Sequence, residues 1–167
     1  MAVNRGKAFE NIIKEAFQKI PGVSVDRIHD QMNGYAGSAN ISDFIIYKKP
    51  YEYYIECKTT HGNTFPFTNI SDNQWRGLLE KSKIEGVKAG VIVWWCDKDV
   101  TKYIPIELLQ VMRDAWNMKS VRYDYEPFDK DTIIIPYFDF ITIQGKKKRI
   151  FWDYDMTTFF KEVENEV

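Results

Sequence analysis

The sequence has few of the residues on which several classes of protein depend. It contains two histidines and two cysteines, Cys57 and Cys96, which stand far apart in the chain. Two distant thiols make no disulfide framework, and with two isolated histidines they make no zinc site. A glycine-rich phosphate-binding loop is also missing, so nothing in the sequence indicates ATP-driven chemistry.

Long hydrophobic runs are absent as well. The apolar stretch from Val91 to Cys96 is among the longest, and it is far shorter than the roughly 18 consecutive residues that a membrane-spanning helix needs. Residues 1–7 lead directly into an amphipathic segment and contain no apolar core of a secretory signal. We therefore expect no membrane span and a cytoplasmic location, where both cysteines stay reduced.

Neither sign of charge dominates, since 23 Lys and Arg stand against 24 Asp and Glu. A nucleic-acid binder usually has an excess of Lys and Arg on at least one face, but a nuclease that gathers carboxylates around metal ions can still sum to zero. The chain is rich in apolar material, with 44% hydrophobic and 16% aromatic residues, which excludes a disordered chain. Its length predicts one domain that spans residues 1–167.

Hydrophobic spacing predicts helices alternating with β-strands. The predicted helices are residues 4–20, a helix that opens at Ser71, residues 105–116 and a last helix capped by Asp155. The predicted strands lie in residues 23–28, 41–47, 52–59, 86–97, 103–104, 132–137, 138–143 and 149–152, with turns at 48–51 and 144–147. This order predicts an α/β fold with a mixed central β-sheet flanked by helices.

Charged residues interrupt two of the predicted strands. Asp43 lies in the segment 41–47, and Glu56 lies in the segment 52–59 two residues before Lys58. Side chains at i and i+2 of a strand share one face about 7 Å apart, so Glu56 and Lys58 point the same way. If the two segments form an antiparallel hairpin, Asp43 can join them at one end of the sheet. Charges within buried strands are costly unless they are paired or bound to metal.

Two carboxylates and a backbone carbonyl supply the oxygen ligands that Mg²⁺ or Mn²⁺ prefers. We expect Asp43, Glu56 and the backbone carbonyl of Cys57 to bind such an ion. Lys58 is no ligand, but beside a metal it can orient or help deprotonate an attacking water, or neutralise charge on a phosphorane. This combination predicts the hydrolysis of phosphodiesters.

Structural interpretations of the same residues stay open. Glu56 and Lys58 could form an exposed cross-strand ion pair, and Glu10, at the edge of the apolar stripe of the first helix, could be a solvated helix charge. Ser71 and Gln74 have the spacing of a capping box, which alone would explain Gln74.

Successive blocks of the sequence resemble the RecU-type Holliday junction resolvases, of the PD-(D/E)XK nuclease superfamily. The resemblance covers about the first 120 residues in the same order, and more faintly the tail around Asp153 and Tyr154. The block that runs from Phe65 into the helix at Gln74 is the most specific of them. The blocks are Asn4 to Glu10, Ser42 to Phe44, Ile55 to Thr60 and Phe65 to Gln74.

The resemblance implies a restriction-endonuclease-like core, a homodimer and Mg²⁺-dependent cutting of four-way DNA junctions by paired nicks. Carried over by position, it implies that Asp43 and Glu56 bind metal and that Lys58 is catalytic. Glu10 would support a second metal ion or its water, and Gln74 would lie near the site.

The sequence departs from the family in two places. Asn73 stands where the family commonly has histidine. The segment 30–40, which corresponds to the family's stalk, is much shorter and contains no Lys or Arg.

Several cations could contact DNA phosphates. The densest basic run is 146–149, although a solvated hairpin tip would explain it as well. Two lysines follow the strand that contains Asp43, next to the proposed site, and Arg5 lies on the apolar side of the first helix. The candidates are Arg5, Lys48, Lys49, Lys146, Lys147, Lys148 and Arg149.

The sequence therefore predicts a metal-dependent, structure-selective DNA endonuclease of RecU type from a bacterium or its phage. Its expected partners are a four-way junction and a second copy of the chain. A host recombinase is a further candidate partner. One alternative is a nuclease of the same superfamily that acts on flaps, forks or duplex DNA. Another is a non-catalytic DNA-binding protein that assists recombination.

Overall fold

A computed structural model describes residues 4–28, 40–117, 132–134 and 140–165 of the chain. The α/β class is confirmed, because helices flank a six-stranded mixed sheet. The helices are α1 (Arg5–Gln18), η1 (Phe67–Asn69), α2 (Asp72–Ser82), α3 (Ile106–Asn117) and α4 (Met156–Asn165). The strands are β1 (Ser24–Arg27), β2 (Phe44–Lys48), β3 (Tyr51–Thr60), β4 (Thr64–Pro66), β5 (Val87–Trp95), β6 (Val100–Pro105), β7 (Thr132–Ile134), β8 (Ile141–Thr142), β9 (Gly145–Lys147) and β10 (Trp152–Tyr154).

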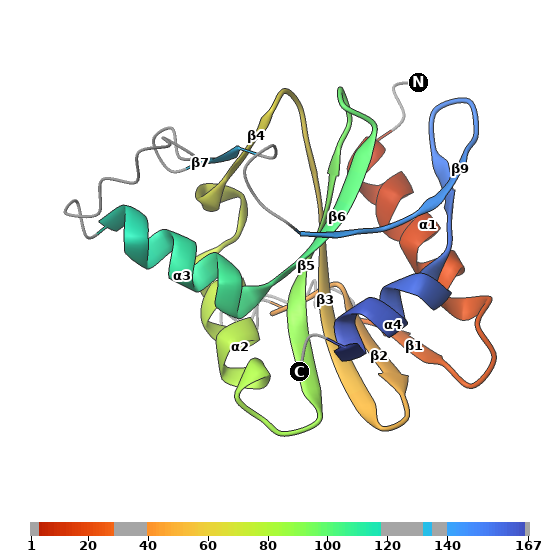
Figure 1. Cartoon of the computed structure of the whole chain (residues 1–167), viewed down its shortest axis with the longest axis horizontal. Coiled ribbons are helices and arrows are strands. Elements are labelled where there is room, and N and C mark those ends of the chain that lie inside the picture. The colour runs from red at the N-terminus through yellow and green to blue at the C-terminus, as the bar shows by residue number, and fades with distance from the viewer. Residues whose placement is uncertain (1–3, 29–39, 118–131, 135–139, 166–167) are drawn as a thin grey trace, which may run out of the picture.

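The main sheet has the strand order β1-β2-β3-β5-β6-β8. β2 and β3 form the predicted antiparallel hairpin, with Phe44 opposite Ile55 and Lys48 opposite Tyr51. β3 and β5 are parallel, and the other neighbours in the sheet are antiparallel. Figure 1 shows α2 and α3 on one side of the sheet and α1 and α4 on the other.

Each face of the sheet has its own core because side chains alternate along the central strands. Trp94 of β5 packs on the α1 side, with its ring centroid 5.7 Å from that of Phe9. Its neighbour Trp95 packs on the α2 and α3 side, 6.1 Å from Phe65. Burial on both faces explains why β5 is an almost unbroken apolar run in the sequence.

The helix starts follow the capping residues in the sequence. The side chain of Asn4 accepts a hydrogen bond from the backbone N–H of Lys7 at the start of α1. Ser71 and Gln74 form a complete capping box at the start of α2, as predicted. Asp155 accepts from the N–H of Thr157 before α4. These contacts satisfy backbone donors that a helix leaves unpaired at its first turn.

The turn predicted at residues 144–147 is wrong. Gly145–Lys147 is instead strand β9, which pairs with β10, so the chain reverses at residues 148–151. Gly145 is needed for close packing, because a Cβ atom there would lie 2.6 Å from the carbonyl oxygen of Asp153. The glycine that suggested a turn is therefore a strand residue in contact with its partner strand.

Three predicted segments lie partly outside the described residues, among them the predicted strand 138–143, of which residues 141–142 form β8. Of the predicted strand 132–137, residues 132–134 form β7, which pairs with β4. The stalk-like segment 30–40 lies outside the description except for Asn40. Across the described part of the chain, no helix has the length and apolar character that crossing a membrane requires.

Candidate active site

The register of the β2–β3 hairpin brings the predicted acids together. Phe44 pairs with Ile55, so the same antiparallel register places Asp43 opposite Glu56. Directly opposed residues of an antiparallel pair point to the same face, and Lys58 follows two positions along β3. Asp43, Glu56 and Lys58 therefore share one face of the sheet, the face that α2 covers.

Asp43 is held where β2 begins by backbone hydrogen bonds. Its N–H donates to the carbonyl of Ile55, and its own carbonyl accepts from the N–H of Ile28. Its Oδ2 atom accepts from the N–H of Cys57 at 2.8 Å. The backbone of Asp43 is thus held by Ile28 and Ile55, and its carboxylate is held against β3 by the N–H of Cys57.

Glu56 is buried, with only 3% of its surface exposed, which contradicts the interpretation of an exposed ion pair. Burial, followed by the negative charge of Asp43, raises the pKa of Glu56 to about 7. Its Oε1 atom contacts Lys58 Nζ at 2.7 Å and accepts from Gln74 Nε2 at 2.6 Å. Its Oε2 atom is buried and has no hydrogen-bond partner.

Gln74 is both a capping residue and a contact of the site. Its Oε1 atom accepts from the N–H of Ser71 in the capping box. The amide nitrogen is thereby left to donate to Glu56. Gln74 therefore caps α2 and contacts Glu56 at the same time, because the cap orients the amide toward the acid.

Glu10 reaches the same region from α1, on the opposite side of the sheet. Burial, and then the negative charge of Asp43, raise the pKa of Glu10. Its carboxylate forms an ion pair with Arg27 of β1, whose guanidinium also donates to Asn11 at 3.0 Å. Arg27 is not among the residues predicted from the sequence, because no spacing along the chain connects β1 with α1.

Cys57, between Glu56 and Lys58 in β3, has a buried thiol. Its pKa is raised well above its ordinary value, first by burial and then by the charges of Asp43, Glu56 and Glu10. The Cys57 side chain lies in the core on the α1 side, while Glu56 and Lys58 on either side of it face α2.

The donor set fits a hard divalent cation of the Mg²⁺ type. Buried Glu56 is opposite Asp43 in the register of the hairpin, and its Oε2 atom has no hydrogen-bond partner. Mg²⁺ is commonly held by one or two carboxylates together with waters and substrate phosphates. In the described residues, no three His, Cys, Asp or Glu side chains form a cluster able to hold a metal ion. Glu10 would have to leave Arg27 before it could act as a ligand.

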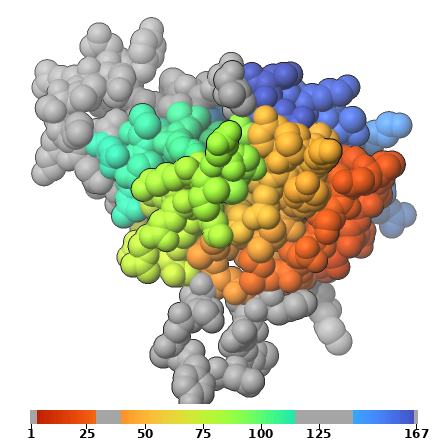
Figure 2. All heavy atoms as spheres, turned by 90° about the horizontal axis from the view of Figure 1, so that it is seen from below, coloured from red at the N-terminus to blue at the C-terminus, as the bar shows by residue number. Residues whose placement is uncertain are grey.

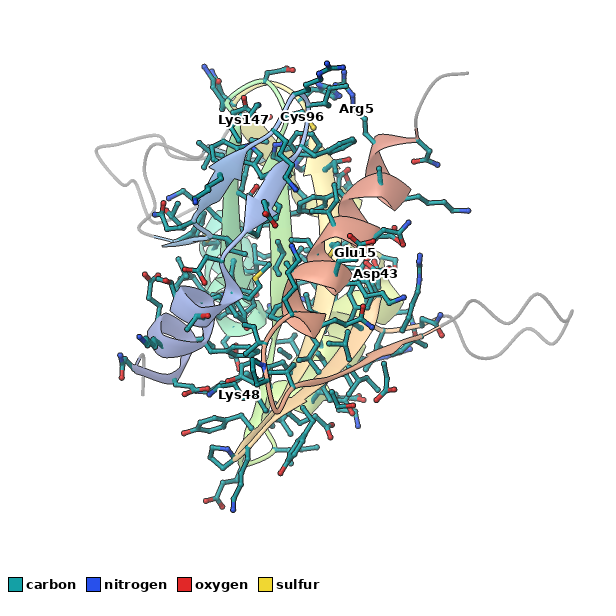
Figure 3. The ribbon with its side chains drawn as sticks, turned by 90° about the vertical axis from the view of Figure 1, so that its right-hand side faces the viewer. Arg5, Glu15, Asp43, Lys48, Cys96 and Lys147 are labelled. Atoms are coloured by element: carbon teal, nitrogen blue, oxygen red, sulfur yellow. The ribbon has the colours of Figure 1, made fainter. Side chains whose placement is uncertain are left out.

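The predicted DNA-contact lysines Lys48 and Lys49 do not lie next to this site. Lys48 ends β2, five residues beyond Asp43, or about 16 Å along an extended strand. Figure 3 shows Asp43 beside α1 and Lys48 at the far end of the hairpin. Lys48 is instead bound to Glu164 of α4 at 2.6 Å, and that carboxylate also accepts from Tyr53.

The other predicted cations lie at the end of the sheet opposite to Lys48. Arg5 lies beside Cys96, the residue after β5, rather than beside Asp43 (Figure 3). Lys146 and Lys147 belong to β9, and Lys148 and Arg149 follow at the turn, all of them exposed.

Comparisons with known proteins leave the family open. No family model and no curated protein sequence matches this chain. Among solved structures, the chain is similar to Hjc of the archaeal hyperthermophile Archaeoglobus fulgidus, a Holliday junction resolvase, with 17% identity and a TM-score of 0.46. The match covers 61% of this chain and 78% of that one. At this level of similarity, the site has to be interpreted from its own geometry.

Proposed function

We propose that this protein is a metal-dependent endodeoxyribonuclease of RecU type that resolves four-way DNA junctions. The observation that carries the proposal is the arrangement of Glu56, which is buried beside Lys58 and opposite Asp43 with one carboxylate oxygen unpaired. A buried acid with an unused acceptor is costly in a protein interior unless a cation completes it.

Each residue has a role in this proposal. Asp43, Glu56 and the backbone carbonyl of Cys57 hold Mg²⁺ or Mn²⁺, and Glu10 supports a second ion or its water. The bound cation supplies a water of lowered pKa and stabilises the negative charge that develops on the phosphate. Lys58, held against Glu56, orients the attacking water or neutralises charge on the phosphorane, and Gln74 fixes the carboxylate of Glu56.

The choice of substrate rests on the sequence blocks rather than on the site. A homodimer would place two sites on opposing strands and so match the two-fold character of a junction. The proposal includes a single domain over residues 1–167 and action in the cytoplasm of a bacterial or phage-infected cell. A host recombinase would be an additional partner.

Nicking of labelled DNA tests the catalytic part of this proposal. Asp43→Asn, Glu56→Gln and Lys58→Ala should each abolish Mg²⁺-dependent nicking of a four-way junction while leaving folding and DNA binding intact. Asp26→Asn removes an exposed carboxylate of β1 and should keep wild-type activity. Full activity in one of the three site variants would remove that residue from the mechanism.

One observation favours a different substrate for the same chemistry. The segment 30–40 contains no Lys or Arg with which to contact a junction centre. A competition assay between linear duplex and four-way DNA separates the two candidates. Equal cutting rates would replace junction resolution with a nuclease that acts on flaps, forks or duplex DNA.

A further inference from the structure

Positive charge gathers at the end of the sheet where β3 and β5 finish. This basic end comprises the first turn of α1, the loops 61–63 and 96–99, and the β9–β10 hairpin. It contains seven Lys and Arg against three Asp, in a chain whose net charge is -1. Figure 3 shows Arg5, Cys96 and Lys147 together at this end of the molecule.

Two aspartates of the β5–β6 turn fix the neighbouring segments in place. Asp97 binds His61 Nδ1 at 2.9 Å and the N–H of Gly62 at 2.7 Å, which holds the loop after β3. Asp99 accepts from Trp152 Nε1 at 3.2 Å and forms an ion pair with Lys147, which holds the hairpin. One short turn therefore joins the end of β3 to the basic hairpin.

Five of the seven cations of the basic end form no ion pair with a described acidic residue, Arg5 and Lys7 of α1 among them. The side chains of Lys98, Lys146 and Arg149 are exposed and form no ion pair with any described residue. Lys147 and Lys148 are already partly neutralised by Asp99 and Asp153. The free charges project from a surface whose backbone is held by the two aspartates, so they are spaced in a defined pattern.

The loop 61–63 of the basic end directly follows the strand that carries Glu56 and Lys58. Lys58 and His61 are three residues apart, or about 10 Å along an extended strand. One strand of duplex DNA carries a phosphate about every 3.4 Å along the helix axis. A duplex with its scissile phosphate at Lys58 would therefore bring phosphates a few nucleotides away over this surface.

We propose that the basic end binds the sugar-phosphate backbone of the duplex arm that leaves the active site. The proposal rests on the proposed nuclease function for the identity of the ligand. The contacts are sequence-independent, since Lys and Arg at exposed positions bind phosphates through charge and release of counterions. His61 lies three residues beyond Lys58, and the hairpin extends the contact along the arm.

The salt dependence of DNA binding tests this inference without any cleavage. Binding of a fluorescein-labelled linear duplex is measured by anisotropy in EDTA at several salt concentrations. The double variant Lys98→Ala/Arg149→Ala should weaken binding at least about tenfold at low salt and make the slope of log K against log salt shallower by about 2.

The matched control removes two exposed lysines from the other end of the sheet. Lys83 precedes β5, about 30 Å from residues 96–99 along that strand, and Lys161 lies one turn before Glu164 of α4. Lys83→Ala/Lys161→Ala has the same change in net charge and should keep the wild-type slope.

Equal slopes and affinities for the wild type and Lys98→Ala/Arg149→Ala would overturn the proposal, and so would equal losses in both double variants. Because the assay contains no divalent cation, its result is independent of catalysis. Loss of binding only at the basic end would support the surface even if nicking were never observed. Nicking together with an unchanged slope would refute the surface and leave the nuclease in place.

Discussion

Glu56 is the residue on which the site depends most. It is surrounded by Lys58, Gln74 and the charge of Asp43, and its burial raises its pKa from 4.5 to about 7. The metal-free folded protein therefore binds a proton on Glu56 at a pH where the unfolded chain has lost it. A cation that binds this carboxylate must displace that proton, so metal affinity should increase as the pH rises through about 7.

This shift predicts how stability depends on pH. Between about pH 4.5 and 7 the folded state binds more protons than the unfolded state, so the metal-free protein loses stability as the pH rises, by about 3 kcal/mol in total. Glu56→Gln should remove most of this dependence, and urea denaturation at several pH values measures it. The exposed Glu80 of α2 supplies the control, since Glu80→Gln should keep the wild-type dependence. An equally steep loss of stability in Glu56→Gln would contradict the assigned origin.

For single residues, the sequence predicted which charged side chains belong to the candidate site better than it predicted the contacts that they make. Asp43, Glu56 and Lys58 were detectable because charges interrupt strands that are otherwise apolar. The pairing of Glu10 with Arg27 was not detectable, because it joins two elements whose packing no local pattern encodes.

Among the elements, the contact of α2 with the segment before β2 positions the site. A Cβ atom on Gly77 of α2 would overlap the side chain of Ile41 and lie 2.7 Å from its Cβ. Ile41 precedes Asp43 by two residues, so this close approach sets the distance between the helix that carries Gln74 and the strand end that carries Asp43. Glycine is required here for space rather than for backbone conformation.

Substitution of this glycine should therefore destabilise the protein. Gly77→Ala gains about 1 kcal/mol of helix propensity but introduces overpacking, which typically costs about 1–3 kcal/mol. Ile41→Ala should relieve the overlap, so the double variant should be more stable than the sum of the single changes predicts, by at least about 0.5 kcal/mol. Free energies of unfolding in urea measure all three.

A matched glycine provides the comparison for this cycle. Gly6 of α1 has only an ordinary contact, 3.5 Å to Asn4 Oδ1, so Gly6→Ala should be neutral or stabilising. Strict additivity of Gly77→Ala and Ile41→Ala would show that α2 does not press on this segment.

Element types followed from the sequence where the hydrophobic period was clear. The spacing of Phe9, Ile13 and Phe17 predicted α1, and the apolar run of β5 predicted a central strand. The turn at 144–147 was mispredicted, because a glycine beside lysines is typical of a turn and nothing local reveals that β10 packs against Gly145. Residues 145–147 form a strand because they pair with β10, which a local sequence pattern does not show.

For the whole molecule, the arrangement of layers explains the site better than the net charge does. Figure 2 shows the N-terminal helix region, the β2–β3 hairpin and the α2–β5 region side by side on one face. Helices from both sides of the sheet contribute to the candidate site, because the charge of Asp43 acts on Glu10 of α1 and Gln74 of α2 donates to Glu56 of β3. A net charge of -1 conceals this separation of an acidic site from a basic end of the sheet.

The central claim is that Asp43 and Glu56 together hold a divalent cation. Calorimetric titration of Mn²⁺ at about pH 8, where Glu56 is mainly ionised, tests it in the wild type, Asp43→Asn, Glu56→Gln and the control Asp26→Asn. The wild type and the control should bind Mn²⁺ equally, and both site variants should lose at least about tenfold in affinity, as expected when a ligand is removed. Equal Mn²⁺ affinity in all four proteins, or no binding by the wild type, would contradict the claim.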